Sequence, residues 1–200
     1  MLSICAVVKN NLDVVIKFLT SLKKNTFGSY QAIIVDNGNT SDVKSYLNLC
    51  LNGGVISTII TNEKNEGLGK ALNQAVDLTT NDYICITDAD IEFLTPGWNL
   101  GMMELLKYPE VGLVGTNKNT GGTWMVKHKN YLESYVLTGC CTMTHRRIIN
   151  HYRGVLENRK EELVNKISKL KSITNDEMYL DYLAQINGIE NFNIKLKKKK

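Results

Sequence analysis

The sequence predicts an α/β fold in which a mostly parallel central sheet is flanked by helices. Two observations support this class. Short β-branched runs alternate with segments whose apolar residues recur at helical spacing, and the run Tyr83–Thr87 is apolar enough to form a central strand. A chain of 200 residues that is 43% hydrophobic can also bury a sizeable core. We therefore expect one domain over residues 1–196, followed by a basic tail at 197–200.

The first half of the chain alternates regularly between the two kinds of segment. Its expected strands are the β-branched runs Ser3–Val8, Gln31–Val35, Val55–Ile60 and Tyr83–Thr87. Helices are expected between them, because apolar residues recur every three or four positions over residues 12–22 and 68–76. A shorter helix is expected over residues 40–49, with Asp42 in its first turn, and another after Pro96 through about Leu106.

The second half is less regular. A glycine-rich strand is expected at Val111–Gly115, then a loop that contains Gly121, Gly122 and Trp124, and then a strand near residues 137–143. Alternating charges with a narrow apolar stripe predict a surface helix near residues 155–171. A further helix is expected at 176–186 and an edge strand at 192–196, with no linker that would divide the chain.

The charge of the chain is concentrated at its end. The formal net charge is +4, and the four lysines at 197–200 account for all of it. Nucleic-acid binding by the folded body is therefore not expected, whereas a peripheral membrane contact through the tail stays open. Five cysteines without a C-x-x-C pair, and the lack of an apolar run near the ~20 residues of a membrane span, indicate a cytoplasmic protein, with the cytoplasmic face of a membrane as an alternative.

Polar residues follow the expected strands. The first strand is followed by Lys9, Asn10 and Asn11, the second by Asp36, Asn37 and Gly38, the third by the turn Asn65-Glu66-Gly67, and the fourth by Asp88, Ala89 and Asp90. In open α/β sheets, ligands bind outside the carboxyl ends of the strands. Two acidic strand ends and two amide-rich turns would therefore share one ligand-binding edge.

The D-x-D pair suggests a metal site. Asp88 and Asp90 are two residues apart at the end of an extended segment, so their side chains leave the same face and can meet one ion. Carboxylates suit Mn²⁺ or Mg²⁺, which complete their coordination with water and substrate phosphates. Of the three histidines, His145 is the one candidate for a third ligand. A pair of solvated acidic residues without a ligand is the alternative.

Five segments in order carry a resemblance to family 2 glycosyltransferases of the GT-A fold. They are SICAVVKNN, IIVDNGNTSD, NEGLGKALN, ICITDADIEF and TNDEMYLDYLAQINGI, between Ser3 and about Gly188. The resemblance implies a Rossmann-like GT-A domain that uses Mn²⁺ or Mg²⁺. It also implies a nucleotide-sugar donor, UDP-linked first of all, and inverting transfer to a hydroxyl of a glycan, a lipid-linked or a protein acceptor.

The same resemblance implies which residues hold the nucleotide. Asp36 would contact the uracil, and the backbone at Val7 and Val8 would lie along the base and ribose. The rest of the nucleotide pocket would be formed by Lys64, Asn65, Gly67, Asp88 and Ala89.

The resemblance further implies the metal ligands and the catalytic base. Asp90, with Asp88, would bind the metal at the diphosphate. The base would come from the acidic pair Asp176-Glu177; the usual order of such pairs favours Glu177, and the reversed order here keeps Asp176 in contention.

Two other classes of function share parts of this pattern. A haloacid-dehalogenase-type phosphatase also places D-x-D after an apolar strand, but its motif opens the fold, whereas here the fourth strand carries it. A catalytically silent nucleotide-sugar-binding module is the second alternative; the intact acidic set argues against it, and donor hydrolysis with Mn²⁺ would separate it from an enzyme.

Overall fold

The computed structural model of the protein describes residues 1–9, 11–109, 111–115, 124–127, 132–134 and 140–150. The chain divides into two units, Met1–Ile148 and Ile149–Lys200, and the elements below belong to the first. The expectation of a single domain through residue 196 stays a prediction.

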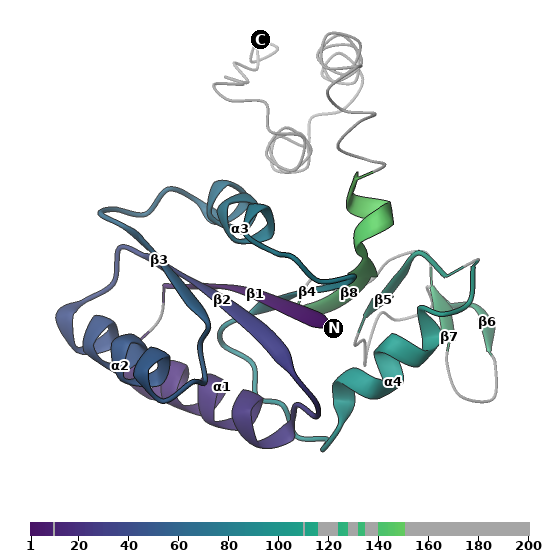
Figure 1. Ribbon diagram of the computed structural model, residues 1–200, viewed down its shortest axis with the longest axis horizontal. Helices are drawn as coiled ribbons and strands as arrows, with labels where there is room; N and C mark the ends of the chain where they lie inside the picture. The colour runs from purple at the N-terminus through teal and green to yellow at the C-terminus, as the bar shows by residue number, and fades with distance from the viewer. Residues whose placement is uncertain (10, 110, 116–123, 128–131, 135–139, 151–200) are drawn as a thin grey trace, which may run out of the picture. The chain divides into compact units, whose positions relative to one another are not determined.

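A six-stranded sheet forms the centre of the first unit (Figure 1). Its strands run in the order β3 (Thr58–Asn62), β2 (Tyr30–Asn37), β1 (Leu2–Val8), β4 (Tyr83–Asp88), β8 (Cys141–His145) and β5 (Leu113–Gly115). The first four strands are parallel, and β8 is antiparallel to both of its neighbours. The expected α/β fold with a mostly parallel sheet is therefore confirmed.

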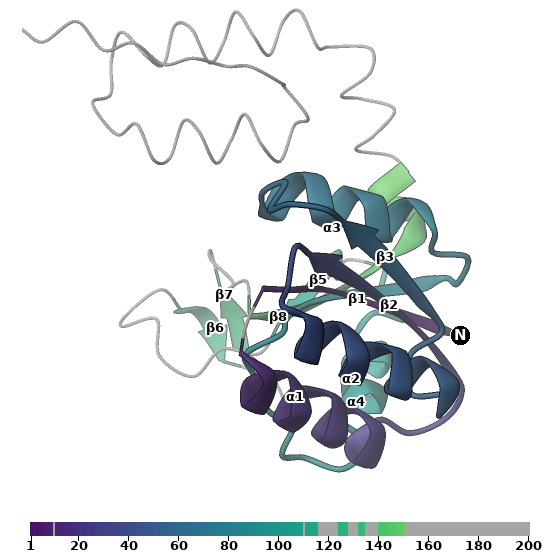
Figure 2. The same ribbon diagram turned by 90° about the vertical axis from the view of Figure 1, so that its left-hand side faces the viewer.

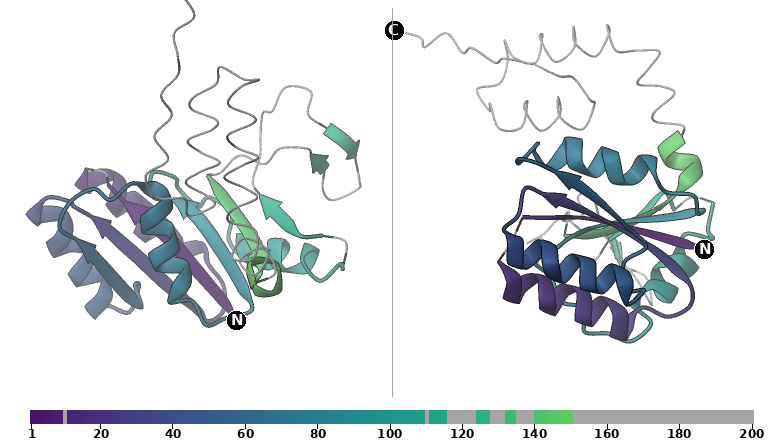
Figure 3. Two further views of the ribbon diagram at one scale, coloured as in Figure 1. Left: turned by 90° about the horizontal axis from the view of Figure 1, so that it is seen from above. Right: turned by 60° about the vertical axis from the view of Figure 1, so that its left-hand side comes forward.

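Helices cover both faces of this sheet. On one face lie α1 (Leu12–Asn25), α2 (Ser41–Asn52) and α4 (Trp98–Leu105), and on the other lies α3 (Leu68–Asp77) (Figures 2 and 3). Within the part of the chain that the structure describes, no helix combines the length and the apolar character that a bilayer crossing requires.

Alternation along β1 divides the sheet residues between the two faces. Leu2, Ile4, Ala6 and Val8 are buried in one apolar core with the helix α1. That helix begins at the N-cap Asn11, whose side chain accepts a hydrogen bond from the backbone N–H of Val14 at 3.1 Å. Because successive strand residues point to opposite faces, the remaining β1 residues face the α3 side.

The structure differs from the expectation at the third strand, at β8 and in the expected loop. The third strand begins at Thr58 and not at Val55, because the backbone N–H groups of Val55 and Ile56 both donate to the carbonyl of Cys50 and hold this part against the end of α2. The strand expected near 137–143 is β8, at Cys141–His145. A short antiparallel pair, β6 (Trp124–Lys127) and β7 (Leu132–Ser134), lies in the stretch expected to be a loop.

The elements expected at 155–171, 176–186 and 192–196 lie outside the described residues.

Candidate active site

The strand order reverses direction between β1 and β4, which creates a topological switch point at the carboxyl edge of the sheet. From β1 the chain continues to β2 and β3 on one side, and then crosses back to β4 on the other. The register pairs Val8 with Asp36 and Val7 with Asp88, so the three strands end level with one another. Switch points of this kind are where open α/β sheets bind ligands. The structure thus brings together four residues that the sequence singled out.

Asp36 holds the turn that follows β2. Its Oδ1 accepts hydrogen bonds from the backbone N–H of Asn39 at 2.9 Å and from the side-chain Nδ2 of Asn39 at 2.7 Å. The same Nδ2 also donates to the carbonyl of Val8 at 2.7 Å, which ties the turn to the end of β1. Asp36 is only 1% exposed, so this carboxylate lies deeper than the open strand end that the sequence suggested. Because both bonds fall on Oδ1, the carboxylate retains acceptor capacity.

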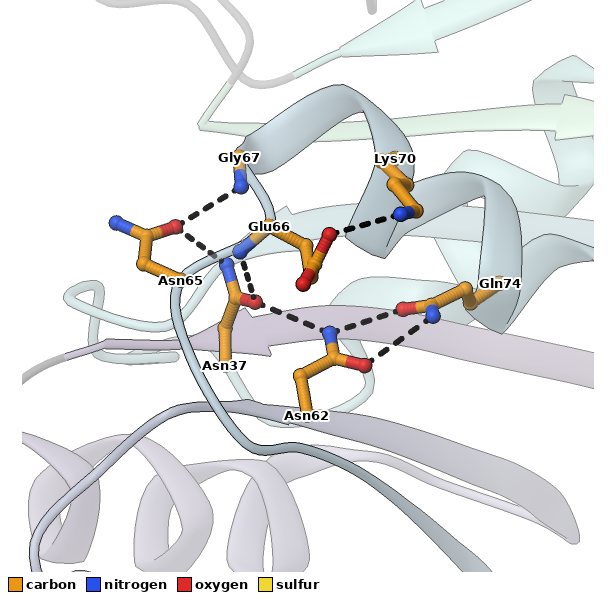
Figure 4. A network of polar contacts seen from close by, with 7 residues as sticks. All are labelled: Asn37, Asn62, Asn65, Glu66, Gly67, Lys70 and Gln74. Carbon is orange, nitrogen blue, oxygen red and sulfur yellow. Dashed lines mark hydrogen bonds and ion pairs between the residues drawn. The ribbon is translucent and has the colours of Figure 1, made fainter.

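A network of uncharged amides occupies the neighbouring strand ends (Figure 4). At its centre is the buried Asn37, the last residue of β2, whose Oδ1 accepts from Asn62 Nδ2 at 3.0 Å. Asn62 ends β3 and exchanges two hydrogen bonds with Gln74 of α3, at 3.0 and 3.2 Å. The network therefore connects two strands and the helix that packs on them. Hydrogen bonds between buried amides hold these strand ends and the helix in place, because leaving one buried amide group unpaired costs about 1–3 kcal/mol.

The same network positions the Asn65-Glu66-Gly67 turn. Asn37 donates through Nδ2 to Asn65 Oδ1 at 2.9 Å and accepts from the backbone N–H of Glu66 at 3.0 Å. Asn65 Oδ1 also accepts from the backbone N–H of Gly67 at 2.9 Å, at the start of α3. Glu66 pairs with Lys70 at 2.7 Å, and this ion pair lowers the pKa of the Glu66 carboxyl. Asn65 and Gly67 are thus placed at the same edge as Asp36.

Gly38 allows the β2 turn to touch the backbone that precedes α3. Its φ is +78°, and a Cβ at this position would lie 2.9 Å from the carbonyl carbon of Lys64 and 3.0 Å from its Cα. No side chain fits there without moving backbone atoms. This contact is where the exposed Lys64, the remaining expected pocket residue on this loop, meets the strand ends.

We expect Gly38→Ala to lower the free energy of unfolding by more than Gly54→Ala does. Gly54 has a φ of +68° but nothing within 4 Å of its ideal Cβ, so it carries the cost of positive φ alone. The overpacking against Lys64 should make Gly38→Ala worse by roughly 1–3 kcal/mol in urea unfolding. Equal destabilisation of the two variants would show that the close approach is unimportant.

Asp88 and Asp90 follow β4 at the same edge. The backbone N–H of Asp88 donates to the carbonyl of Cys140 at 2.9 Å, so Asp88 is fixed within the sheet. Burial and, after it, the nearby charge of Asp90 raise the pKa of the half-buried Asp88 carboxyl. Asp90 itself is exposed, in the turn after the strand. Ala89, between them, is buried and faces the core.

The two carboxylates fit a hard divalent cation. Burial and, after it, the charge of Asp90 raise the pKa of Asp88, and a positive ion would offset both by favouring the ionised carboxylate. Oxygen ligands are those that Mg²⁺ and Mn²⁺ prefer. Among the described residues no group of three or more His, Cys, Asp or Glu side chains could hold a metal. A site of two carboxylates still suits these ions, since they keep water and substrate phosphates as further ligands.

His145 is not part of this site, and the expectation that it is a third metal ligand is wrong. In the antiparallel register of β8, His145 pairs with Tyr83, the first residue of β4, and its ring contacts the Tyr83 ring at a centroid distance of 5.4 Å. Asp88 lies five residues further along β4, which at about 3.3 Å per residue is about 16 Å away. The remaining sequence candidates, Asp176 and Glu177, lie outside the described residues.

Three polar residues at this edge, Asn39, Asn62 and Gln74, are not among the sequence candidates. Asn37 is among the polar residues expected after the second strand, but without a role of its own. Amides recur in a wide range of loops, and no spacing connects positions 37, 62 and 74. The available signal was that two of these amides, Asn37 and Asn62, end neighbouring parallel strands.

Comparison with solved structures supports the fold. A mannosyltransferase, PcManGT from Pyrobaculum calidifontis, solved in complex with GDP-Man and Mn²⁺, matches with a TM-score of 0.64 at 16% identity, over 76% of this chain and 46% of that chain. S. aureus TarS 1-349 in complex with UDP-GlcNAc matches with a TM-score of 0.56 at 16% identity, over 70% and 44% of the two chains. This chain therefore spans less than half the length of either. No curated protein matches it significantly.

Comparison with family models identifies the family. Residues 3–164 match the model described as Glycosyl transferase family 2, which is most of the chain. The matched span contains the switch point, the amide network and the D-x-D pair. The first four of the five sequence segments lie within the matched residues, and the fifth, which carries Asp176 and Glu177, lies beyond them. Together with the GT-A-like sheet, this match confirms the family resemblance, and the chain belongs to glycosyl transferase family 2.

Proposed function

We propose that this chain is a metal-dependent glycosyltransferase that moves a sugar from a UDP-sugar to an acceptor hydroxyl with inversion. The observation that carries the proposal is the register that sets Asp36 and Asp88 level on either side of β1, beside the Asn65-Glu66-Gly67 turn. The family match supports it, as do the GDP-Man and UDP-GlcNAc bound by the two solved relatives.

In this proposal the β1–β2 side of the crevice holds the nucleotide. The Asp36 carboxylate accepts a charge-assisted hydrogen bond from a ring N–H, as the imino group of uracil offers. The backbone at Val7 and Val8 lies along the base and ribose. Lys64, with Asn65 and Gly67, completes the pocket, and the amide network holds that loop in its bound shape before the donor arrives.

The β4 side holds the reacting end of the donor. Mn²⁺ or Mg²⁺ between Asp88 and Asp90 would neutralise charge on the departing diphosphate, so that no protein acid is needed there. Asp88 would contribute a carboxylate from a residue whose backbone is bonded into the sheet, and Asp90 one from the exposed turn that follows. Glu177 or Asp176 removes the proton from the acceptor hydroxyl as its oxygen attacks the anomeric carbon from the face opposite the diphosphate.

A screen of donors tests this function. UDP-, GDP- and dTDP-sugars are added with and without Mn²⁺, and the midpoint of thermal unfolding and the release of free nucleotide diphosphate are measured. A UDP-sugar with Mn²⁺ should stabilise the chain most, since a ligand at 100 times its Kd adds about 2.7 kcal/mol. Stabilisation without nucleotide release or transfer to any acceptor would favour the silent binding module, and no stabilisation by any donor would contradict the proposal.

We expect Asp36→Ala to weaken UDP binding roughly 10- to 150-fold, the equivalent of about 1.5–3 kcal/mol for a hydrogen bond to a charged group. Isothermal titration calorimetry measures the change. Asn39→Ala is the matched control, because it removes the side-chain partner of Asp36 Oδ1 and keeps the carboxylate. If Asn39→Ala loses as much affinity as Asp36→Ala, the loss comes from a disturbed turn and not from a missing hydrogen bond to the uracil.

A further inference from the structure

The segment that follows Asp90 is first bonded to the helix α1 at Phe93. Its backbone N–H donates to Ser21 Oγ at 3.0 Å, and its carbonyl accepts from Asn25 Nδ2 at 2.5 Å. All three residues are buried. Both backbone groups of one loop residue are thus held by two side chains of the same helix.

The spacing of Ser21 and Asn25 lets both side chains bond to the backbone of Phe93. They lie four residues apart, so they sit one above the other on one face of α1. The Ser21 hydroxyl donates in turn to the carbonyl of Phe18 at 2.9 Å, and the carbonyl of Asn25 accepts from the N–H of Gly97 at 2.8 Å. Polar side chains on the core side of a helix need such partners, and here the loop supplies them.

The ring of Phe93 adds a second attachment. It stacks on Trp98 at a centroid distance of 4.4 Å and an interplanar angle of 21°, and it lies 6.1 Å from the ring of Phe18. Trp98 is itself held by a hydrogen bond from Nε1 to Thr26 Oγ1 at 3.1 Å. The position of Phe93 is therefore determined both by its backbone and by its side chain.

The residues around Phe93 have less support. Glu92, Leu94 and Pro96 are exposed, and between them and α1 lies a surface hollow of about 390 Å³ whose lining also includes Lys17. Ser21 and Asn25 lie at this hollow and bridge from the helix to the loop. Loss of either bond would leave a buried backbone group of Phe93 without its partner.

We propose that Ser21 and Asn25 are positioning residues of the metal site. The backbone of Asp88 is bonded into the sheet, whereas Asp90 lies in the turn after it. Ile91 then packs against the core, and Phe93 makes the next backbone hydrogen bonds among the described residues. By fixing Phe93, the two α1 side chains set the placement of Asp90 relative to Asp88. This inference rests on the proposed function, because it requires that the aspartates bind a metal.

Ser21→Ala tests the inference through metal affinity. The Kd for Mn²⁺ in the presence of UDP, measured from free Mn²⁺ by electron paramagnetic resonance, should rise roughly tenfold, the lower end of what outer-shell partners contribute. The affinity for UDP without metal should stay within about twofold of the parent, and Ser21→Thr, which keeps the hydroxyl, should restore Mn²⁺ binding. Lys17→Ala is the matched control, since it lies one turn earlier on the same face of α1 at the same hollow.

The outcomes separate this inference from the proposed function. If the parent and Asp90→Ala bind Mn²⁺ equally, the metal site is wrong, and the positioning role is overturned with it. If Mn²⁺ binding depends on Asp90 but Ser21→Ala binds it like the parent, the positioning role alone is overturned. A lower thermal midpoint with unchanged Mn²⁺ affinity would likewise show a merely structural role.

A measurement on the parent chain covers the case in which Ser21→Ala does not fold. If fixing Phe93 strengthens metal binding, then metal binding must by linkage stabilise the fixed segment. Hydrogen exchange at the Phe93 amide should therefore slow when Mn²⁺ and UDP are added. An exchange rate that is unchanged at saturating Mn²⁺ would overturn the inference.

Discussion

Replacing Asp90 with asparagine is expected to reduce sugar transfer by roughly a thousandfold, because a metal that stabilises the departing diphosphate supplies several kcal/mol. The fold should remain, since Asp90 is exposed and lies outside the β4 ladder. Steady-state transfer rates at saturating UDP-sugar and increasing Mn²⁺ measure the loss. Asp90→Asn should show little further rise in rate with Mn²⁺.

Glu92→Gln is the matched control for this prediction. It removes one negative charge from an exposed residue two positions further along the same loop. The control should stay within about threefold of the parent, because exposed charges separated from the reaction are weakly coupled and screened by salt. Equal losses in Glu92→Gln and Asp90→Asn would assign the effect to the net charge of the loop and would contradict metal ligation by Asp90.

The raised pKa of Asp88 gives the metal affinity a definite pH dependence. Burial and the charge of Asp90 make ionisation of Asp88 costly, so the folded state is destabilised as pH rises through this pKa and carries no such cost below the unfolded value. Metal binding requires the ionised carboxylate. Affinity for Mn²⁺ should therefore weaken on acidification at a higher pH than for an ordinary aspartate. In Asp90→Asn the part of the shift caused by Asp90 disappears.

Glu177→Gln and Asp176→Asn, made separately, are expected to identify the catalytic base. A positioned carboxylate base contributes about 10²- to 10⁴-fold, so one of the two variants should lose transfer by that factor and keep its donor affinity. Calorimetry with UDP measures donor binding, and a coupled assay measures transfer. Product analysis should show inversion at the anomeric carbon.

The pair also opens an expected helix after Thr174 and Asn175, where acidic residues are favourable without any catalytic role. A variant affected only as a helix-capping residue would unfold at a lower temperature and keep its turnover. If both variants retain nearly the parental rate, or if the product keeps the anomeric configuration of the donor, neither residue acts as the inverting base.

The strand ends were predictable because a parallel sheet brings carboxyl ends to one edge. Asp36 and Asp88 could therefore be placed together from the apolar runs that precede them. His145 could not, because its position depends on the direction of β8, and an apolar run looks the same in a parallel and an antiparallel strand. The structure pairs His145 with the first residue of β4, far from the last.

Burial was harder to predict than position. Ile56 was expected in a strand because it is β-branched and apolar, and it is only 2% exposed. Its backbone N–H, however, donates to the carbonyl of Cys50 near the end of α2 and not to a neighbouring strand. Asp36 was expected at an open strand end, and it is only 1% exposed, with its Oδ1 bonded to Asn39 three residues later. Both residues make local hydrogen bonds, and composition does not record such bonds.

The amide network has a consequence for how the site responds to its medium. Asn37, Asn62, Asn65 and Gln74 carry no charge, so their hydrogen bonds neither titrate nor weaken through ionic screening. The Lys70–Glu66 ion pair beside them is exposed and contributes little. The shape of the loop before α3 should therefore persist from low to high ionic strength. Changes of pH or salt at this edge should therefore act through its charged side chains, and the amide network that positions the loop should not respond to them.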